Sequence, residues 1–158
     1  MDAFDEAYAQ HYPGVLRFVR GMLGARGDAA DVAQETFLRL HAQRPDASEV
    51  RFWLFRVARN LAINELRRVS IRERLAHLIA FSPPRDPQAL TIAEEERRRL
   101  GDALAKLPAD QRAALLLREW EGLSYDEIAS TAGCSVAKVK SDLFRARQTL
   151  RAAFGRNP

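Results

Sequence analysis

The chain has 158 residues with a net charge of +4 and a pI of about 9.7, and 47% of its residues are hydrophobic. That length allows one mid-sized domain or two small ones, and the apolar content is sufficient for packed cores. Eight glycines and seven prolines are too few for a β-sandwich or a disordered chain, and the one cysteine, Cys134, excludes a disulfide framework within the chain.

The first fifty residues are net acidic and predict two helices. Residues 4 to about 23 carry apolar side chains at helical spacing (Val15, Phe18, Val19, Met22 and Leu23), with Pro13-Gly14 as a candidate break. A second helix should begin after the N-cap Asp28 and end near His41, with one face formed by Val32, Thr36, Phe37 and Leu40. We expect no signal peptide and no membrane span, and therefore a cytoplasmic protein.

A strongly basic segment, residues 51–74, follows a loop around Pro45. It predicts a third, longer helix from about 49 to 68 or beyond, buried through Trp53, Leu54, Val57, Ala58 and Leu61. Aromatic side chains interleaved with arginines suit single-stranded DNA, because bases stack on the rings and the cations follow the phosphates. Composition alone leaves this open, since Trp53 and Val57 also fit a core.

The sequence SPPRDP, residues 82–87, cannot continue a helix. We therefore place a linker at about 70–91, between an N-terminal domain, 1–69, and a C-terminal domain, 92–158. In the second domain the sequence predicts helices at about 91–107 and 109–120, followed by a helix-turn-helix unit. Ser124 and Glu127 form a capping box that opens this unit, Gly133 lies in its turn, and Ser135 caps a last helix that ends near Phe154.

The last predicted helix has two different faces. An apolar stripe comprises Val136, Val139, Leu143, Ala146, Leu150 and Phe154. The opposite face carries Ala137, Ser141, Phe144, Arg145 and Gln148, flanked by Lys140 and Arg151. The second helix of such a unit enters the major groove of DNA, where Lys or Arg reads guanine and an aromatic ring packs on a thymine methyl. The alternative is a solvated charged face with one exposed Phe.

The predicted acidic helix in DAADVAQETFLRL has two interpretations. It is either an ordinary amphipathic helix, whose acidic first turn suits the helix dipole, or a protein-binding surface. Catalysis has no support, because the three histidines lack metal-ligand spacing and there is no phosphate-binding glycine loop. We expect no enzyme activity, no metal and no cofactor.

Three segments together resemble a known family: DAADVAQETFLRL, then FWLFRVARNLAINELRR, then LAKLPADQRAALLLREWEGLSYDEIASTAGCSVAKVKSDLFRARQTLR. They are similar to bacterial RNA polymerase sigma factors of the extracytoplasmic-function type, over nearly the whole chain apart from the linker. The resemblance implies an all-α fold of two small helical domains, sigma regions 2 and 4, joined by a flexible linker. The second would be a four-helix domain with a helix-turn-helix. It also implies a promoter-specificity subunit that directs transcription initiation at −35 and −10 elements.

The resemblance further implies three binding surfaces. The acidic helix would bind the clamp helices of the β′ subunit of core RNA polymerase, through Asp31, Gln34, Glu35, Phe37 and Leu38. Loop 44–52 and the following helix would read the −10 element and capture a flipped base, through Arg51, Phe52, Trp53, Arg56, Arg59 and Asn60. Region 4 would hold the β flap and read the −35 duplex, through Lys138, Lys140, Ser141, Phe144, Arg145 and Gln148.

Two departures from the family pattern bear on promoter choice. Asp142 stands where the family often has Arg, which adds negative charge near the DNA, and the loop AQRPDASEVRF differs from the commoner glycine-rich form. We expect an altered promoter preference or phosphate contact rather than lost binding. The family also implies control by an anti-sigma factor, with the chain a monomer when free or 1:1 with this inhibitor. The alternatives are a freestanding helix-turn-helix regulator and a sigma mimic that titrates an anti-sigma factor.

Overall fold

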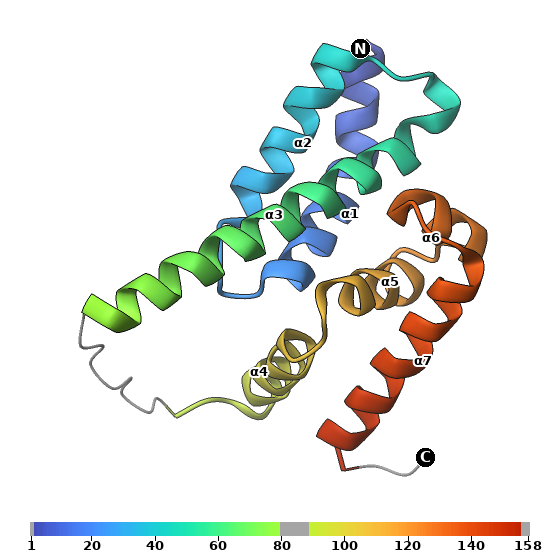
Figure 1. Ribbon diagram of the computed structural model, residues 1–158. Helices are drawn as coiled ribbons and strands as arrows, with labels where there is room; N and C mark the ends of the chain where they lie inside the picture. The colour runs from blue at the N-terminus through green and yellow to red at the C-terminus, as the bar shows by residue number, and fades with distance from the viewer. Residues whose placement is uncertain (1, 80–88, 156–158) are drawn as a thin grey trace.

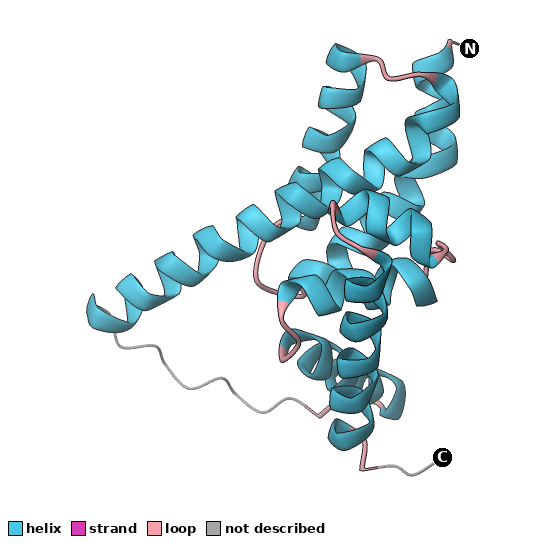
Figure 2. Ribbon diagram, turned by 45° about the vertical axis from the view of Figure 1, so that its right-hand side comes forward, coloured by secondary structure: helices cyan, strands magenta, loops and turns pink. Residues whose placement is uncertain are grey.

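The computed structural model describes residues 2–79 and 89–155, and within these ranges every regular element is helical (Figures 1 and 2). An N-terminal group contains α1 (Ala3–Leu23), α2 (Ala29–Gln43), the short 3-10 helix η1 (Ala47–Glu49) and α3 (Val50–Ile79). A C-terminal group contains α4 (Ile92–Ala105), α5 (Ala109–Glu119), α6 (Tyr125–Ala132) and α7 (Val136–Ala153). The predicted all-α fold, with a four-helix C-terminal part, is confirmed.

Side-chain caps fix the helix starts that the sequence predicts. The Asp28 carboxylate accepts a hydrogen bond from the Asp31 amide at 3.1 Å, and the Ser135 hydroxyl accepts one from the Lys138 amide at the same distance. Ser124 and Glu127 form both bonds of the predicted capping box. Gly133 then ends α6 in the left-handed conformation, at φ 68°, which costs glycine little because it has no Cβ. The helix-turn-helix is therefore held by local bonds at each junction.

Helix α1 does not break at Pro13, where the sequence suggested an interruption. It is continuous from Ala3 to Leu23, although proline removes one backbone hydrogen bond from a helix interior. Aromatic contacts on the N-terminal side of the proline hold the helix to α2: Tyr8 stacks on Tyr12 with ring centroids 4.7 Å apart, and both rings contact Phe37. This packing offsets the lost bond.

The linker expected at 70–91 begins later in the structure. Residues 70–79 continue α3 as helix, and this end of α3 projects away from the other helices (Figure 1). The SPPRDP sequence lies outside the described residues. The projecting end exposes three apolar side chains at helical spacing, Ile71, Leu75 and Leu78.

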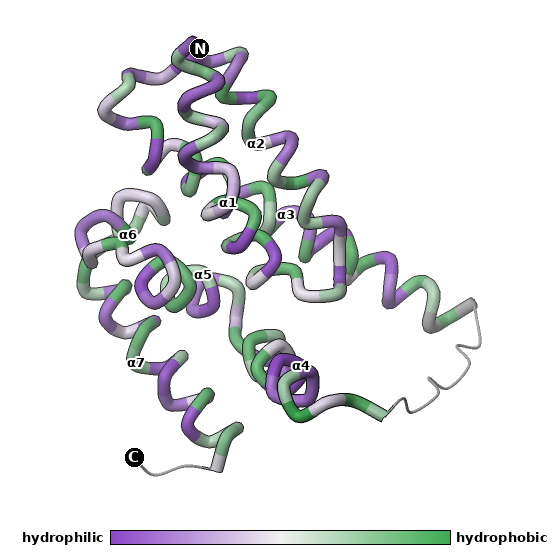
Figure 3. The backbone as a smooth tube through the Cα atoms, turned by 180° about the vertical axis from the view of Figure 1, so that it is seen from behind, coloured by the Kyte–Doolittle hydropathy of each residue, from purple (hydrophilic) through white to green (hydrophobic). Residues whose placement is uncertain are grey.

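The two groups of helices share one contiguous apolar cluster. Hydrophobic and hydrophilic residues alternate along the helices, as expected for helices with one buried face (Figure 3). The five apolar residues predicted on α1 are all buried, and α1 contacts α4 and α5 as well as α2 and α3. At Gly21 a Cβ atom would lie only 2.7 Å from the Trp120 ring and 2.8 Å from Leu116. The groups are therefore packed closely against each other.

Candidate nucleic-acid and protein interfaces

Helix α7 presents the polar face predicted from its sequence. Lys140, Ser141, Arg145 and Gln148 are exposed, and Phe144 has 61% of its surface in solvent. Val139, Leu143 and Ala146 are buried on the opposite side. An exposed aromatic ring among cations at the second helix of a helix-turn-helix has the composition of a major-groove surface.

The exception on α7 is Lys138, whose ammonium group already has two acidic partners. Its Nζ lies 2.7 Å from Asp142 Oδ2 and 3.3 Å from Asp110 Oδ2. The hydrogen bond to Asp142 and the charges of both carboxylates raise the pKa of Lys138 above its ordinary value. The Asp142 side chain is only 13% exposed. Its charge is therefore neutralised within the protein rather than presented to DNA, contrary to the expectation that it adds negative charge near the DNA.

The basic face of α3 is divided between solvent and the C-terminal group. Arg56 and Asn60 are exposed, whereas Phe52 and Trp53 are half-buried. Arg51 donates from Nη2 to the carbonyl oxygen of Glu121 at 2.6 Å. Arg59 donates from Nη2 to Asp110 Oδ1 at 2.8 Å, and its side chain is 12% exposed. Sequence reasoning missed both partners, because neither acid stands out among the charged residues of α5 and the turn that follows it.

A cavity of about 460 Å³ lies beneath the loop that precedes α3. It is formed by the first turns of α1, the end of α2 and the loop itself, with Phe4, His11, His41, Arg44, Pro45 and Val50 among its lining residues. Burial lowers the pKa of His11, and the charge of Arg51 lowers it further. His11 is therefore neutral at pH 7. Rings line this cavity together with the charged side chains of Asp2, Glu6 and Arg44, and such a mixture can hold a planar polar ligand such as a base.

The residues of α2 that the resemblance assigns to polymerase binding differ in their exposure to solvent. Asp31, Gln34 and Glu35 are exposed, and Leu38 is 58% exposed. Phe37, which the resemblance assigns to the polymerase surface, is only 2% exposed and packs against Tyr8, with ring centroids 5.0 Å apart. In this structure the Phe37 side chain is therefore packed inside the N-terminal group, where it supports the α2 surface from within.

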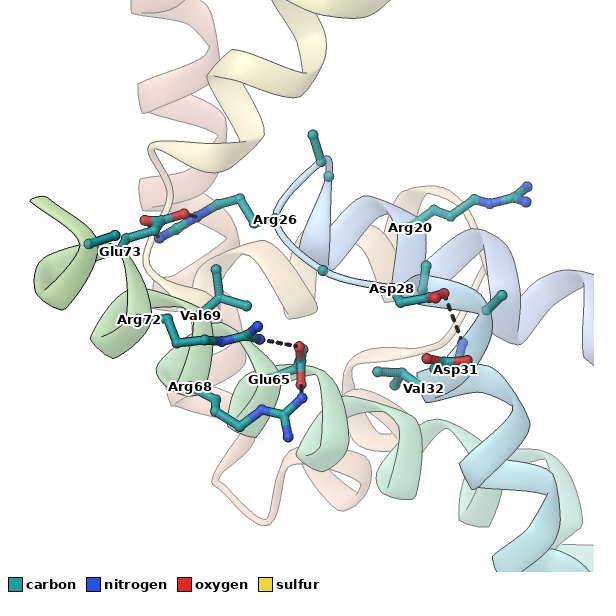
Figure 4. Close-up of a pocket in the computed structure, with 16 residues that line it drawn as sticks. Arg20, Arg26, Asp28, Asp31, Val32, Glu65, Arg68, Val69, Arg72 and Glu73 are labelled. Atoms are coloured by element: carbon teal, nitrogen blue, oxygen red, sulfur yellow. Dashed lines mark hydrogen bonds and ion pairs between the residues drawn. The ribbon is translucent and has the colours of Figure 1, made fainter. Parts of the chain in front are cut away.

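A charged groove adjoins the first turn of α2 (Figure 4). It has a volume of about 1080 Å³ and lies between the α1–α2 turn, α2 and α3. Glu65 accepts ion pairs from Arg68 at 2.9 Å and from Arg72 at 3.7 Å, and Arg26 pairs with Glu73 at 2.7 Å. A smaller hollow of about 370 Å³ continues along α2 past Asp31 and Glu35, with Leu61, Asn64 and Arg68 on its α3 side. Sequence reasoning missed these α3 residues, because nothing in the sequence indicates that they face α2.

Among the described helices, none combines the length and the apolar character that crossing a bilayer requires.

Comparison with known proteins identifies both groups of helices. The family model of sigma-70 region 2 matches residues 7–71, and that of sigma-70 region 4 matches residues 97–150. The chain is 37% identical to the ECF RNA polymerase sigma factor SigE of Mycolicibacterium smegmatis, over 96% of this chain and 61% of the relative. It is 35% identical to the ECF RNA polymerase sigma factor SigM of Bacillus subtilis, over 96% of this chain and 95% of the relative.

A solved structure shares the fold of the whole chain. Sigma factor RpoE, in its complex with the anti-sigma factor NepR from Bartonella quintana, matches with a TM-score of 0.80 and 24% identity, over 100% of both chains. This chain spans about three fifths of SigE but nearly all of SigM. Both sigma-70 regions are present in order, and the match to SigM covers almost the entire length of both proteins. The chain therefore belongs to the sigma-70 family of RNA polymerase sigma factors, in its extracytoplasmic-function group.

Proposed function

We propose that the protein is a promoter-specificity subunit that binds core RNA polymerase in the cytoplasm and directs initiation at −35 and −10 elements. It is a non-enzymatic initiation factor. The observation that carries the proposal is the presence, on one chain, of an exposed acidic face on α2 and an exposed basic face on α7. These two surfaces have opposite charge and suit different partners, a polymerase subunit and a DNA duplex.

The α2 surface binds the β′ clamp helices through Asp31, Gln34, Glu35 and Leu38, with Phe37 holding the helix in place. The polar face of α7 reads the −35 duplex. The loop before α3, with Phe52, Trp53, Arg56 and Asn60, reads the −10 strand, and the adjoining cavity supports capture of a flipped base. The C-terminal group also holds the β flap. Control by an anti-sigma factor is part of the proposal, and the RpoE structure with its anti-sigma factor supports it.

We expect Glu35→Arg to abolish co-elution with bacterial core RNA polymerase on size exclusion. Glu35 is exposed and pairs only locally with Arg39, at 3.2 Å, so the change reverses a surface charge without opening the core. Glu96→Arg is the matched control, because Glu96 is exposed on α4 and has no ion pair in the described part of the chain. Co-elution should persist with this control. If the unaltered protein binds duplex DNA tightly but does not co-elute with core polymerase, a freestanding regulator is favoured. If it does neither, the sigma mimic is favoured.

Lys140→Ala and Arg145→Ala should each weaken −35 duplex binding and spare core binding. A lost phosphate contact lowers the slope of log affinity against log salt by about one, whereas a lost base contact costs about 1–3 kcal/mol and relaxes preference at one position. Lys106→Ala removes the same charge from an exposed position outside α7 and serves as the control. Fluorescence anisotropy at several salt concentrations measures both quantities. Unchanged promoter selectivity in both α7 variants would contradict this role for the helix.

A further inference from the structure

A strongly basic hollow lies between the C-terminal half of α3 and the start of α5. Its volume is about 610 Å³, and its lining comes from α3, from the α1–α2 turn and from the first turn of α5. Among the described residues that line it, four are arginines and one is an acid: Arg26, Arg67, Arg74, Arg112 and Asp110. These arginines belong to none of the surfaces proposed for polymerase or promoter.

Arg112, which lines this hollow, has a hydrogen-bond donor that the protein leaves unused. The residue is 5% exposed, and its two Nη atoms donate to backbone carbonyls at the junction of α1, α4 and α5. Its Nε atom is buried and has no partner within residues 2–79 and 89–155. A buried donor without an acceptor is uncommon and costly. An acceptor from outside the chain would satisfy it.

The first turn of α5 offers further free donors at the same hollow. The first helical bond of α5 runs from the Arg112 amide to the Pro108 carbonyl oxygen, at 2.9 Å, so the three preceding amides have no partner inside the helix. Pro108 occupies the N-cap position and provides no side-chain cap. Pro108, Ala109 and Asp110 all line the hollow. Uncapped amides at a helix N-terminus, with the positive end of the helix dipole, favour an anion.

The charges around the hollow are not balanced by its own acid. Asp110 is already engaged, because its Oδ1 accepts from Arg59 at 2.8 Å and its Oδ2 lies 3.3 Å from Lys138. Arg67 and Arg74 are exposed and form no ion pair in the described part of the chain. Burial lowers the pKa of Arg112, and the charge of Arg26 lowers it further. The hollow therefore has excess positive charge.

One wall of the hollow is apolar. It is formed by side chains of α3: Ile63 is half-buried, Leu66 is 9% exposed and Ile71 is 57% exposed. A volume of about 610 Å³ exceeds the space that one phosphate group fills and is in the range of small-molecule sites. An apolar wall beside a cationic floor suits a ligand that combines phosphate groups with a ring.

We propose that this hollow binds a small phosphorylated anion, whose phosphate groups lie between Arg67, Arg74 and Arg112 at the start of α5. A phosphate group has several acceptor oxygens and up to two negative charges, so it supplies partners for the orphan Nε donor and the free amides together. Free phosphate anions and nucleotides share this chemistry. The site does not rest on the proposed function, because its arginines lie outside the surfaces assigned to polymerase and promoter.

The test measures binding of inorganic pyrophosphate and of adenosine triphosphate to the full-length protein by isothermal titration calorimetry, in magnesium-free buffer at about 0.15 M salt. Arg67→Gln combined with Arg74→Gln should weaken binding about tenfold or more, because two charged donors are lost. Arg97→Gln combined with Arg98→Gln is the matched control, since it removes the same charge from exposed positions of α4. The control should bind within about twofold of the parent.

The two probes distinguish the sources of the phosphate. Equal affinities for pyrophosphate and adenosine triphosphate assign the site to a free phosphate anion, whereas tighter binding of adenosine triphosphate assigns it to a nucleotide whose ring packs on the apolar wall. Both results support the site, provided that the α3 double variant weakens binding and the α4 double variant does not.

The orphan donor is tested without any substitution. In protein labelled with ¹⁵N at arginine, the Nε–H resonance of Arg112 should shift on addition of pyrophosphate. The Nε–H resonance of Arg118 is the control and should stay in place, because Arg118 lies outside the lining of this hollow and already donates from Nη1 to the Leu123 carbonyl oxygen at 2.9 Å.

Several results would overturn the proposal. These are the absence of binding by either probe, an equal loss of binding in both double variants, or an unmoved Arg112 resonance at saturating pyrophosphate. Binding of duplex DNA that requires Arg67 and Arg74, with no binding of either small probe, would instead place these arginines on nucleic-acid phosphates. No measurement of the small probes involves polymerase, so this site and the proposed function can fail separately.

Discussion

Replacing Phe37 with alanine is expected to lower the free energy of unfolding of the N-terminal group by about 3–5 kcal/mol, whereas Leu38→Ala costs less than about 0.5 kcal/mol. Phe37 is 2% exposed and its ring contacts Tyr8 and Tyr12, so truncation leaves a cavity between α1 and α2. Leu38 is 58% exposed and has little packing to lose. Two adjacent apolar residues on one helix should therefore differ widely in their effect on stability.

The same two variants should rank in the reverse order when their binding to core RNA polymerase is measured. At a temperature where both variants are folded, Leu38→Ala should bind core polymerase more weakly than Phe37→Ala. Urea unfolding followed by Trp53 fluorescence, in a Trp120→Phe background, measures stability of the N-terminal group. Binding of each variant to surface-immobilised core polymerase measures its affinity for the polymerase. A stable Phe37→Ala variant that has lost all core binding would instead indicate a direct contact between Phe37 and the polymerase.

Phe37 also explains which sequence arguments succeeded. Hydrophobic spacing placed it on the buried face of α2 with Val32, Thr36 and Leu40, and all four are buried. Resemblance placed the same residue on the polymerase surface, because a motif records which residues matter without recording whether they touch the partner. Periodicity and capping are local, so they predicted the helix starts after Asp28, Ser124 and Ser135 and the outward face of α7.

Contacts between distant segments could not be predicted in this way. Arg59 is 51 residues from Asp110 in the chain, and Arg17 is 104 residues from Glu121. Any exposed acid of the C-terminal group would have suited an arginine equally well on charge alone. The linker was placed too early, at residue 70, although Ile71, Leu75 and Leu78 continue the helical spacing; these side chains are exposed on the projecting end of α3 rather than buried in the core.

Arg112 carries the second large prediction, because it is buried and donates to backbone carbonyls of both groups. Its guanidinium bonds the carbonyl oxygen of Met22 at the end of α1, and those of Ala105 and Leu107 after α4 at 3.1 and 2.9 Å. Burial lowers the pKa of Arg112, and the charge of Arg26 lowers it further, but an arginine remains charged at neutral pH. The partial negative charges of two helix C-termini therefore stabilise this cation in place of a carboxylate.

Arg112→Met should lower the free energy of unfolding of the C-terminal group by about 3 kcal/mol, since methionine fills similar space but leaves the three carbonyls without their donor. Arg97→Met, at an exposed position of α4, is the matched control and should change stability by less than about 0.5 kcal/mol. Urea unfolding followed by Trp120 fluorescence, in a Trp53→Phe background, measures this group directly. The midpoint should fall with an unchanged denaturant slope. A stability equal to that of the control would mean that water replaces the guanidinium without cost, and that Arg112 is not what joins α1 to the junction of α4 and α5.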